Sequence, residues 1–458
     1  MYKINFSNPI HIHFIGIGGI SMSGLAEILL KEGFCVSGSD AKESPLTQHL
    51  EQMGAKIFYG QKAENIIDGI QCVVYTAAIQ KENPELLEAL RKNLPTLSRA
   101  ELLGQLMNNY DVPIAVSGTH GKTTTTSMLS HIFLEGELDP TISVGGILPA
   151  IQGNIRVGNS GIFLTEACEY TNSFLHLLPK INIILNVEED HLDFFKDLED
   201  IRNSFRKFAA LLPPDGTVVI NGEIENYQDI CKDLDCNVIT FGWNGDFNYS
   251  ATNPSYDDKG CISFDLLHNG NFVRRIHMAV PGEHNVSNAL ASIATADLLN
   301  ISLDTIQNGL ASFHGTNRRF QYKGMLNEVT IIDDYAHHPT EIIATLDAAM
   351  HYPHQSLWCV FQPHTYTRTK AFYHEFAEAL SKADHVILAD IYAARETDTL
   401  GVSSEGLTEE IRKLGTDAHY FSTFNEIEDF LKQNCKPKDL VLTMGAGDVV
   451  KIGEELLK

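Results

Sequence analysis

The run AVSGTHGKTTTTS, at positions 115–127, puts a lysine and a threonine directly after a glycine turn. Lys122 supplies a mobile positive charge, the Thr123 hydroxyl can ligate Mg²⁺, and the amides that open the following helix attract phosphate oxygens. The common motif has its first glycine where Val116 stands, so this loop starts later, at Gly118. The pattern favours ATP binding over a purely structural turn. The ATP-binding residues expected here are Gly118, Thr119, His120, Gly121, Lys122, Thr123 and Thr124.

A second glycine turn lies near the N-terminus, in HFIGIGGISMSGL at positions 13–25. An apolar run ends in Gly16, Gly18 and Gly19, and a helical pattern follows, which is the layout of a diphosphate pocket. The dinucleotide fingerprint requires a further glycine where Ser21 stands. The turn therefore predicts a bound diphosphate but leaves open which molecule carries it.

A carboxylate and an imidazole follow two further apolar runs. Glu166 comes directly after GIFLT, and His191 lies in NVEEDHLD after INIIL. Both could join Thr123 on one metal ion, although Mg²⁺ prefers oxygen ligands. Alternatively, Glu166 caps a helix and His191 hydrogen-bonds within its own loop, and spacing alone does not separate these possibilities.

Two polar pairs lie further along the chain. Asn285 and Asn288, in PGEHNVSNAL, are three residues apart and share a helix face, or else they cap the helix. Arg318 and Arg319, in GTNRRFQYKG, lie near an expected domain junction, where an arginine can stabilise charge on a transferring phosphoryl group. A surface ion pair is the alternative for the arginines.

The segment DDYAHHPTE follows the apolar run VTII and precedes a helix that is expected to begin with Pro339. Four polar or aromatic residues lie between the apolar run and this helix: Asp334, Tyr335, His337 and His338. Adjacent histidines rarely share a metal ion, so hydrogen bonding to a ribose or a substrate is better supported than zinc.

The segment QPHTYTRTKAF follows the run LWCVF in the same way. It contains His364 and Arg368, and a planar guanidinium suits bidentate binding of a carboxylate. These residues therefore predict a site for an acidic substrate group.

Short apolar runs alternate with helical patterns throughout, which predicts an α/β fold with parallel sheets. The alternation restarts at PIAVSG and again after FHGTNRRFQYKG, so we expect three successive α/β units. Within the second, CISFDLLHNGNFVRRIHMAV predicts a hairpin that turns at Asn269-Gly270. In such sheets ligands bind beyond the carboxyl ends of the strands, where the polar residues above are found.

The composition narrows the possible partners. The chain has 458 residues, and 34 Lys and Arg against 59 Asp and Glu give a formal charge of −25. This charge argues against binding nucleic acid, and no apolar stretch is long enough for membrane insertion. Eight scattered cysteines and the lack of a signal-peptide pattern predict reduced thiols and a cytoplasmic location.

The ordered set of motifs resembles the Mur ligase family of ATP-dependent amino-acid ligases. The similarity extends over essentially the whole chain, through the segments GIGGISMSGLA, SGTHGKTTTTS, NVEEDHLD, PGEHNVSNAL, GTNRRFQ, DDYAHHPTE, QPHTYTRT and MGAGD. It implies an N-terminal Rossmann-like UDP-binding domain at 1–111, a central P-loop ATPase-like domain at 112–319 and a C-terminal Rossmann-like domain at 320–458.

The resemblance also implies a reaction. ATP phosphorylates the carboxylate of UDP-N-acetylmuramate, and the amine of L-alanine attacks the resulting acyl phosphate. The expected partners are thus ATP, UDP-N-acetylmuramate and L-alanine, with Mg²⁺ as cofactor and a monomer or homodimer as the active form. A ligase that attaches a tripeptide to the same sugar nucleotide is the nearest alternative; Tyr335 and MGAGD favour L-alanine.

Residue roles follow from the matching motifs. Lys122, His191 and Arg319 are expected to be catalytic, and Thr123, Glu166 and His191 to hold Mg²⁺. Asn285, Asn288, Arg319 and Asp334 would complete the ATP site. The amino acid and the muramyl carboxylate would meet Tyr335, His337, His364 and Arg368. The residues implied to bind the UDP-sugar are Gly16, Gly18, Gly19, Ser21, Asp40, Thr76 and Arg99.

Several positions depart from the family pattern. Ser21 replaces a common glycine, Gln61 stands where many relatives have histidine, and Cys168 and Tyr170 interrupt the usual ADESD segment. Phe205 occupies the position of the carbamylated lysine of some sister ligases, so no such modification is expected. An oxidoreductase built on the first glycine turn and a non-catalytic nucleotide-binding module are the rivals from other classes.

Overall fold

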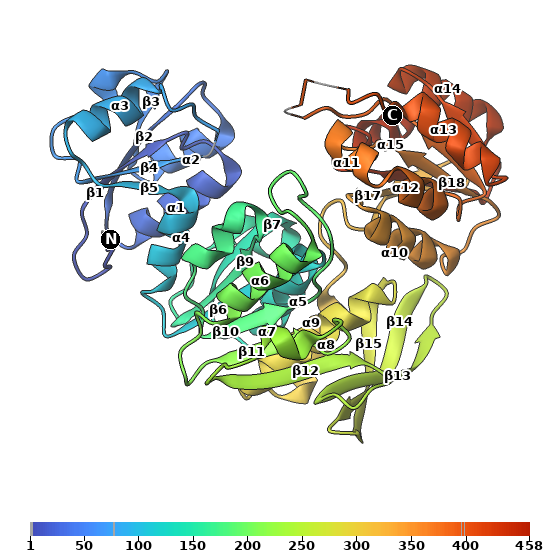
Figure 1. Ribbon diagram of the computed structural model, residues 1–458, viewed down its shortest axis with the longest axis horizontal. Coiled ribbons are helices and arrows are strands. Elements are labelled where there is room, and N and C mark those ends of the chain that lie inside the picture. The colour runs from blue at the N-terminus through green and yellow to red at the C-terminus, as the bar shows by residue number, and fades with distance from the viewer. Residues whose placement is uncertain (1–2, 77, 395, 398) are drawn as a thin grey trace. The chain divides into compact units, whose positions relative to one another are not determined.

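The computed structural model describes residues 3–76, 78–394, 396–397 and 399–458. Its contacts divide the chain into two units. The first contains residues 1–187 and 199–239, and the second contains residues 188–198 and 240–458. The strands pair mainly in parallel and helices separate them along the chain, so the predicted α/β class is confirmed (Figure 1).

The first unit begins with a parallel sheet in the order β3-β2-β1-β4-β5. Ser98 caps the last helix of this region in a capping box with Glu101, which satisfies amides that the helix itself leaves unpaired. The elements are β1 His11–Ile15, α1 Ile20–Lys31, β2 Cys35–Asp40, α2 Pro45–Gln52, β3 Lys56–Tyr59, the 3₁₀ turn η1 Ala63–Asn65, β4 Cys72–Tyr75, α3 Pro84–Arg91, β5 Thr96–Ser98 and α4 Arg99–Met107.

The rest of the first unit is a second sheet region with strands in the order β11-β10-β6-β9-β7-β8. All neighbours are parallel except β7 and β8. The elements are β6 Val112–Ser117, α5 Lys122–Glu135, β7 Thr141–Leu148, η2 Pro149–Ile151, β8 Gly153–Arg156, β9 Ile162–Ala167, η3 Tyr170–His176, β10 Ile181–Ile184, α6 Leu198–Ala209, β11 Thr217–Asn221 and α7 Tyr227–Ile230.

The second unit opens with the strand order β15-β14-β13-β12, followed by two helices. The predicted hairpin is confirmed: β14 and β15 are antiparallel, and Asn269 and Gly270 both have positive φ, as a type I′ turn requires. The elements are β12 Asn237–Trp243, which straddles the unit boundary, β13 Tyr249–Tyr256, β14 Cys261–His268, β15 Asn271–Pro281, α8 His284–Leu298 and α9 Leu303–Ser312.

The C-terminal sheet of the second unit has the order β16-β17-β21-β18-β19-β20, and only β16 is antiparallel to its neighbour. The elements are β16 Gln321–Leu326, β17 Val329–Asp334, α10 Pro339–Met350, β18 Leu357–Phe361, α11 Tyr366–Ala371, α12 Tyr373–Leu380, β19 His385–Leu388, α13 Ser404–Lys413, β20 Asp417–Tyr420, α14 Phe424–Asn434, β21 Leu440–Met444 and α15 Val450–Leu456.

Strand β18 explains how helices cover both faces of this sheet. Successive side chains of a strand point to opposite faces. Cys359 and Phe361 pack in a core with α10, α12 and α13, whereas Trp358 and Val360 pack in a core with α14 and α15. A strand buried on both faces is apolar at every position, which accounts for the continuous run LWCVF.

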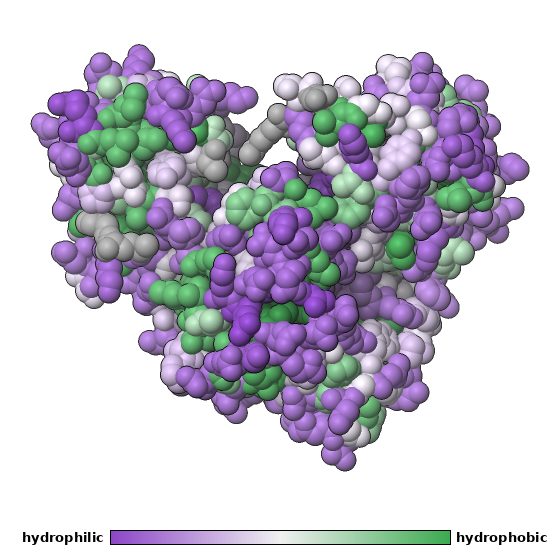
Figure 2. Space-filling model, in the orientation of Figure 1, coloured by the Kyte–Doolittle hydropathy of each residue, from purple (hydrophilic) through white to green (hydrophobic). Residues whose placement is uncertain are grey.

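Polar side chains dominate the surface, in keeping with the acidic composition. Figure 2 shows hydrophilic residues over most of the visible face, with small apolar patches between them. In the described part of the chain, no helix combines the length and apolar character needed to cross a membrane.

Replacing Phe361 by alanine tests the importance of the core that β18 forms with α10, α12 and α13. The ring is fully buried and lies 5.6 Å from that of Phe376. We expect the substitution to lower the free energy of unfolding by about 3–5 kcal/mol, because it removes contacts and leaves a cavity. Both tryptophans, Trp243 and Trp358, lie in the second unit, so urea unfolding followed by their fluorescence reports on it.

The matched control is Leu414→Ala, because that side chain is 53% exposed. We expect it to change the unfolding free energy by less than about 0.5 kcal/mol. Equal effects of the two substitutions would contradict the assignment of Phe361 to the core.

Candidate functional site

Lys122 begins α5 and folds back over the turn that precedes it. Gly118 and Gly121 both have positive φ, and a Cβ on Gly118 would lie 2.9 Å from Leu185 Cβ, so this turn requires glycine. Because Gly121 has no side chain, the N-cap position itself places nothing over the first amides of α5. The turn thus has the backbone form of an anion site.

The ammonium group of Lys122 is held by oxygen atoms. Nζ donates to the Thr119 carbonyl at 3.0 Å and to the Gly118 carbonyl, and it lies 3.0 Å from Glu169 Oε2. Burial favours the neutral amine, but Glu169 and nearby acidic groups outweigh this effect and raise the pKa of Lys122. The lysine is therefore a cation at neutral pH. Sequence reasoning did not select Glu169, whose side chain is only 3% exposed.

Thr123 and Glu166 are brought together by neighbouring parallel strands. Glu166 lies on β9, which pairs with β6, and Thr123 is the second residue of α5. The Thr123 hydroxyl donates to Glu166 Oε2 at 3.0 Å, and the Gly145 amide donates to Oε1. Glu166 is thus a strand residue, and its alternative interpretation as a helix cap is wrong. The third predicted ligand, His191, belongs to the second unit.

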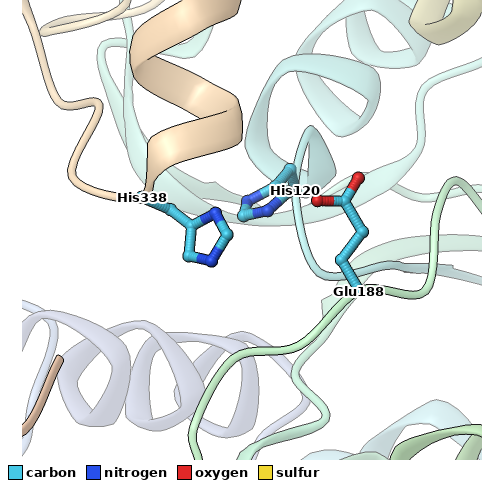
Figure 3. Close-up of side chains that lie close together, drawn as sticks. All are labelled: His120, Glu188 and His338. Atoms are coloured by element: carbon cyan, nitrogen blue, oxygen red, sulfur yellow. The ribbon is translucent and has the colours of Figure 1, made fainter. Parts of the chain in front are cut away.

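Asn186, which follows β10, holds the glycine turn before α5 through three hydrogen bonds. Its Oδ1 accepts from the His120 amide at 2.7 Å, and its Nδ2 donates to the His120 carbonyl at 3.1 Å. The Thr119 amide donates to the Asn186 carbonyl at 3.3 Å. Asn186 lies in the NVEEDHLD segment, which sequence analysis singled out only for His191. The His120 side chain is drawn in Figure 3.

The N-terminal glycine turn borders a cavity of about 690 Å³ in the first unit. The Gly18 amide donates to Asp40 Oδ2 at 2.8 Å. Gly16 has φ +82°, and a Cβ there would lie 2.7 Å from Thr76 Cγ2, so both the backbone conformation and the available space favour glycine.

The lining of this cavity agrees in part with the predicted set. Among the described residues, the predicted ones that line it are Gly16, Gly18, Gly19, Asp40 and Thr76. Ser21, on α1, and Arg99, the first residue of α4, are not among its lining residues, and their roles stay predictions. Sequence reasoning did not select Glu82 and Asn83, which also line the cavity, while Gln61 was noted there only as a departure.

The second unit gathers the residues predicted to bind substrate carboxylates. Arg368 Nε and one terminal nitrogen donate to Asp190 Oδ1 at 3.3 and 2.9 Å, and the other terminal nitrogen lies 3.3 Å from His364 Nδ1. The His364 and His337 rings are 5.9 Å apart, and those of His337 and Tyr335 are 5.4 Å apart. Asp190, next to His191, is the member of this cluster that the sequence analysis missed.

Burial and charge set the protonation of this cluster. Burial opposes ionisation of Asp190, but Arg368 and His191 hold its pKa well below the usual range. Burial lowers the pKa of His337 to about 4 and also lowers that of His364. Both histidines are therefore neutral at pH 7, and Arg368 is the permanent cation among the four residues predicted for this site.

The segment 188–198 is tied to the start of α10 within the second unit. Thr340 Oγ1 donates to Glu188 Oε2 at 2.8 Å, and His338 Nε2 lies 3.0 Å from the Glu189 carbonyl oxygen. Figure 3 shows the Glu188 and His338 side chains. His338 also caps α10, whose first residue is Pro339 as predicted, so His338 has a structural task.

The two neighbouring arginines differ in their contacts. Arg318 Nε donates to the buried Asp333 at 3.1 Å, and a terminal nitrogen donates to the Gly445 carbonyl at 2.6 Å. Both guanidinium groups lie over the Tyr335 ring, with Cζ 4.9 Å from its centre for Arg318 and 5.2 Å for Arg319. Arg318 therefore forms an ion pair, but with a fully buried partner rather than at the surface as the alternative interpretation had it. The catalytic role expected of Arg319 stays a prediction.

Asp334 is a buried carboxylate at the end of β17. Its oxygens accept from the Phe320 and Ala336 amides, each at 2.7 Å. Burial nevertheless raises its pKa to about 6, although Arg319 and the two amides act in the opposite direction.

Asn285 and Asn288 lie inside α8 rather than at its cap, which is Glu283. Asn288 Nδ2 donates to Asn285 Oδ1 at 3.1 Å, so the predicted shared face is confirmed, whereas the capping interpretation is wrong. Asn285 Nδ2 donates to the Pro281 carbonyl at 2.7 Å. The expected contact of both residues with ATP stays a prediction.

Comparison with known families supplies the class of the protein. The model described as "Mur ligase family, catalytic domain" matches residues 11–111, "Mur ligase middle domain" matches 116–296, and "Mur ligase, glutamate ligase domain" matches 318–447. The chain belongs to the Mur ligase family and is an ATP-dependent ligase. The domain boundaries expected at 111/112 and 319/320 stay predictions.

Individual relatives are similar to this chain along its full length. A UDP-N-acetylmuramate–L-alanine ligase from Agathobacter rectalis is 59% identical over 458 residues, and one from Lachnospira eligens is 58% identical over 459, each match covering 100% of both chains. Among solved structures, the UDP-N-acetylmuramate-alanine ligase of Thermotoga maritima has a TM-score of 0.80 at 29% identity. A murein peptide ligase from Psychrobacter arcticus has 0.68 at 26%, and each covers 98% of both chains.

The raised pKa of Asp334 predicts a pH dependence of ATP use. If the anionic carboxylate accepts hydrogen bonds from the nucleotide ribose, its protonation removes an acceptor. Since the pKa is about 6, we expect kcat/KM for ATP to fall as the pH drops from 7 through 6. Asp334→Asn should lower kcat/KM at pH 7.5 by about 10–100-fold and abolish the inflection near pH 6. An inflection that persists in this variant would assign the titration to another group.

Proposed function

We propose that this chain joins L-alanine to the carboxylate of UDP-N-acetylmuramate, using ATP and releasing ADP and phosphate. The observation that carries the proposal is the 59% identity over both full lengths to a relative named UDP-N-acetylmuramate–L-alanine ligase. The cationic Lys122, which follows a glycine turn, and the cavity beside the N-terminal glycine turn support the use of two phosphate-bearing substrates. The reaction would supply a peptidoglycan precursor.

The chemistry requires activation because a carboxylate is a poor electrophile. The muramyl carboxylate oxygen attacks the γ-phosphorus of ATP, forming an acyl phosphate and releasing ADP. The neutral amine of L-alanine then attacks the acyl carbon and loses a proton. The tetrahedral intermediate collapses, the carbon–oxygen bond to phosphate breaks, and an amide and inorganic phosphate result. We assign to Lys122 and Arg319 the stabilisation of charge during phosphoryl transfer.

The residues around Thr123 fit a magnesium ion. The Thr123 hydroxyl and the Glu166 carboxylate provide oxygen donors 3.0 Å apart, which is the ligand chemistry that Mg²⁺ prefers. The Gly145 amide, by donating to the other oxygen of Glu166, orients this carboxylate. Magnesium, when bound, supplies positive charge that neutralises the phosphate oxygens. His191 is proposed as a further ligand.

In the second unit, we assign binding of the amino acid and the muramyl carboxylate to Tyr335, His337, His364 and Arg368. Arg368 provides a planar cation, and Asp190 fixes its orientation through two hydrogen bonds. The neutral histidines can form hydrogen bonds without adding charge. Asn285, Asn288 and Asp334 would bind the nucleoside part of ATP. We place the reaction in the cytoplasm, in keeping with eight cysteines that form no disulfide in the structure, all of them at described positions.

The choice of acceptor is tested by phosphate release. With ATP, Mg²⁺ and UDP-N-acetylmuramate present, we expect release to require an amine and to be at least about tenfold faster with L-alanine than with glycine, L-serine or a muramyl-type tripeptide, because a site fitted to one substrate loses contacts with the others. Preference for the tripeptide would identify a muropeptide ligase. No release with any amine would contradict the ligase proposal.

Lys122→Ala separates the two nucleotide sites. We expect phosphate release to fall by at least about 10³-fold, because the variant lacks the cation at the phosphate loop. Binding of UDP-N-acetylmuramate, measured by calorimetry, should change less than about twofold, since Lys122 is not among the residues that line the N-terminal cavity. Lys413→Ala, at a side chain 71% exposed, is the control. Equal loss of both functions in Lys122→Ala would contradict separate sites.

A further inference from the structure

Glu85 is a fully buried carboxylate next to the cavity of the first unit, and none of the roles assigned above involves it. It is the second residue of α3, directly after Pro84, which lines the cavity. A buried charge is costly unless it is paired and hydrogen-bonded, so the surroundings of this carboxylate need an explanation.

Three further parts of the chain contact the Glu85 carboxylate. From the end of β2, the Ser39 hydroxyl donates to Oε2 at 2.6 Å. From the segment 60–65, the Lys62 amide donates to Oε1 at 3.3 Å and the Asn65 side-chain amide donates to the same oxygen. From β1, His13 Nε2 lies 3.7 Å from Oε2.

Two of these segments, the end of β2 and residues 60–65, also supply residues to the cavity wall, as does the start of α3. Ser39 precedes Asp40, which accepts from the Gly18 amide, and Lys62 follows Gln61. Asn83 caps α3 two residues before Glu85, and its side chain donates to Gln61 Oε1 at 2.6 Å. Asp40, Gln61 and Asn83 all line the cavity. The Glu85 carboxylate thus connects three segments that form the wall of the cavity.

Charge makes this connection stronger than a neutral side chain would. Hydrogen bonds to an ionised acceptor are roughly twice as strong as neutral ones. Burial opposes ionisation of Glu85, but hydrogen bonds from its neighbours outweigh that effect and lower its pKa. The start of α3 also favours an anion at this position.

We propose that Glu85 is a positioning residue for the sugar-nucleotide cavity. It does not line the cavity, but its carboxylate holds Asp40, Gln61 and Asn83 in the arrangement that receives the nucleotide part of the ligand. The inference rests on the proposed function, because that function assigns the cavity to UDP-N-acetylmuramate.

The test compares Glu85→Gln with Glu88→Gln. Glu88 is on the same helix, and its carboxylate pairs with the exposed Arg91 instead of with the cavity segments. The Glu85→Gln side chain keeps its shape but presents a donor where one accepting oxygen was. We expect the dissociation constant and the KM for UDP-N-acetylmuramate to rise about tenfold, as loss of a hydrogen bond to a charged group implies. The KM for ATP and kcat at saturation should stay within about twofold, and Glu88→Gln should match the wild type.

A second variant keeps the test valid if Glu85→Gln does not fold. Asn65→Ala deletes one donor to Glu85 but leaves the carboxylate itself, and we expect a rise of about three- to tenfold in the same two constants only. Unchanged binding in both variants, or a parallel change in kcat and in both KM values, would overturn the positioning role. If the wild type itself does not bind UDP-N-acetylmuramate, the proposed function fails and this inference fails with it. Tight binding by the wild type and by both variants would overturn the inference alone.

Discussion

A lysine ammonium that is largely withdrawn from solvent needs hydrogen-bond acceptors around it, and the elements that surround β6 in the first unit provide them for Lys122. Lys122 is held by the turn carbonyls and by Glu169, which is nearly inaccessible to solvent. The parallel pairing of β6 with β9 and β10 brings these oxygens together, since β9 leads to Glu169 and β10 leads to Asn186. For a chain with a formal charge of −25, such a local cation favours the phosphate binding that we propose for this turn.

The same principle recurs at three buried carboxylates. Arg368 is paired with Asp190, Arg318 with Asp333, and the Glu85 carboxylate with donors from neighbouring segments. In each case the charged group follows or faces the carboxyl end of a parallel strand. Such ends converge on one edge of a sheet, so residues far apart in sequence can satisfy one another there. The helices and apolar strands supply the rigidity that keeps these pairs in register.

The motifs predicted a large part of this arrangement. The glycine turns, the strand before Lys122, the hairpin at Asn269-Gly270 and Pro339 at the start of α10 depend on local backbone chemistry, which neighbouring residues control. Two interpretations were wrong because they considered only local capping: Glu166 lies on a strand, and Asn285 lies inside its helix. Ser21 and Arg99 resemble ligand residues of the family, yet they do not line the described cavity.

By itself, the sequence determined the α/β class, the glycine turn before Lys122 and the family resemblance, because these depend on short runs whose residue types follow from local backbone geometry. Tertiary structure alone decided which charges are paired. Nothing in the local sequence connects Lys122 to Glu169, Arg368 to Asp190, or Glu85 to Ser39 and Asn65. These partners are separated by 20 to 178 positions, so only the pairing of strands and the packing of helices brings them within hydrogen-bonding distance.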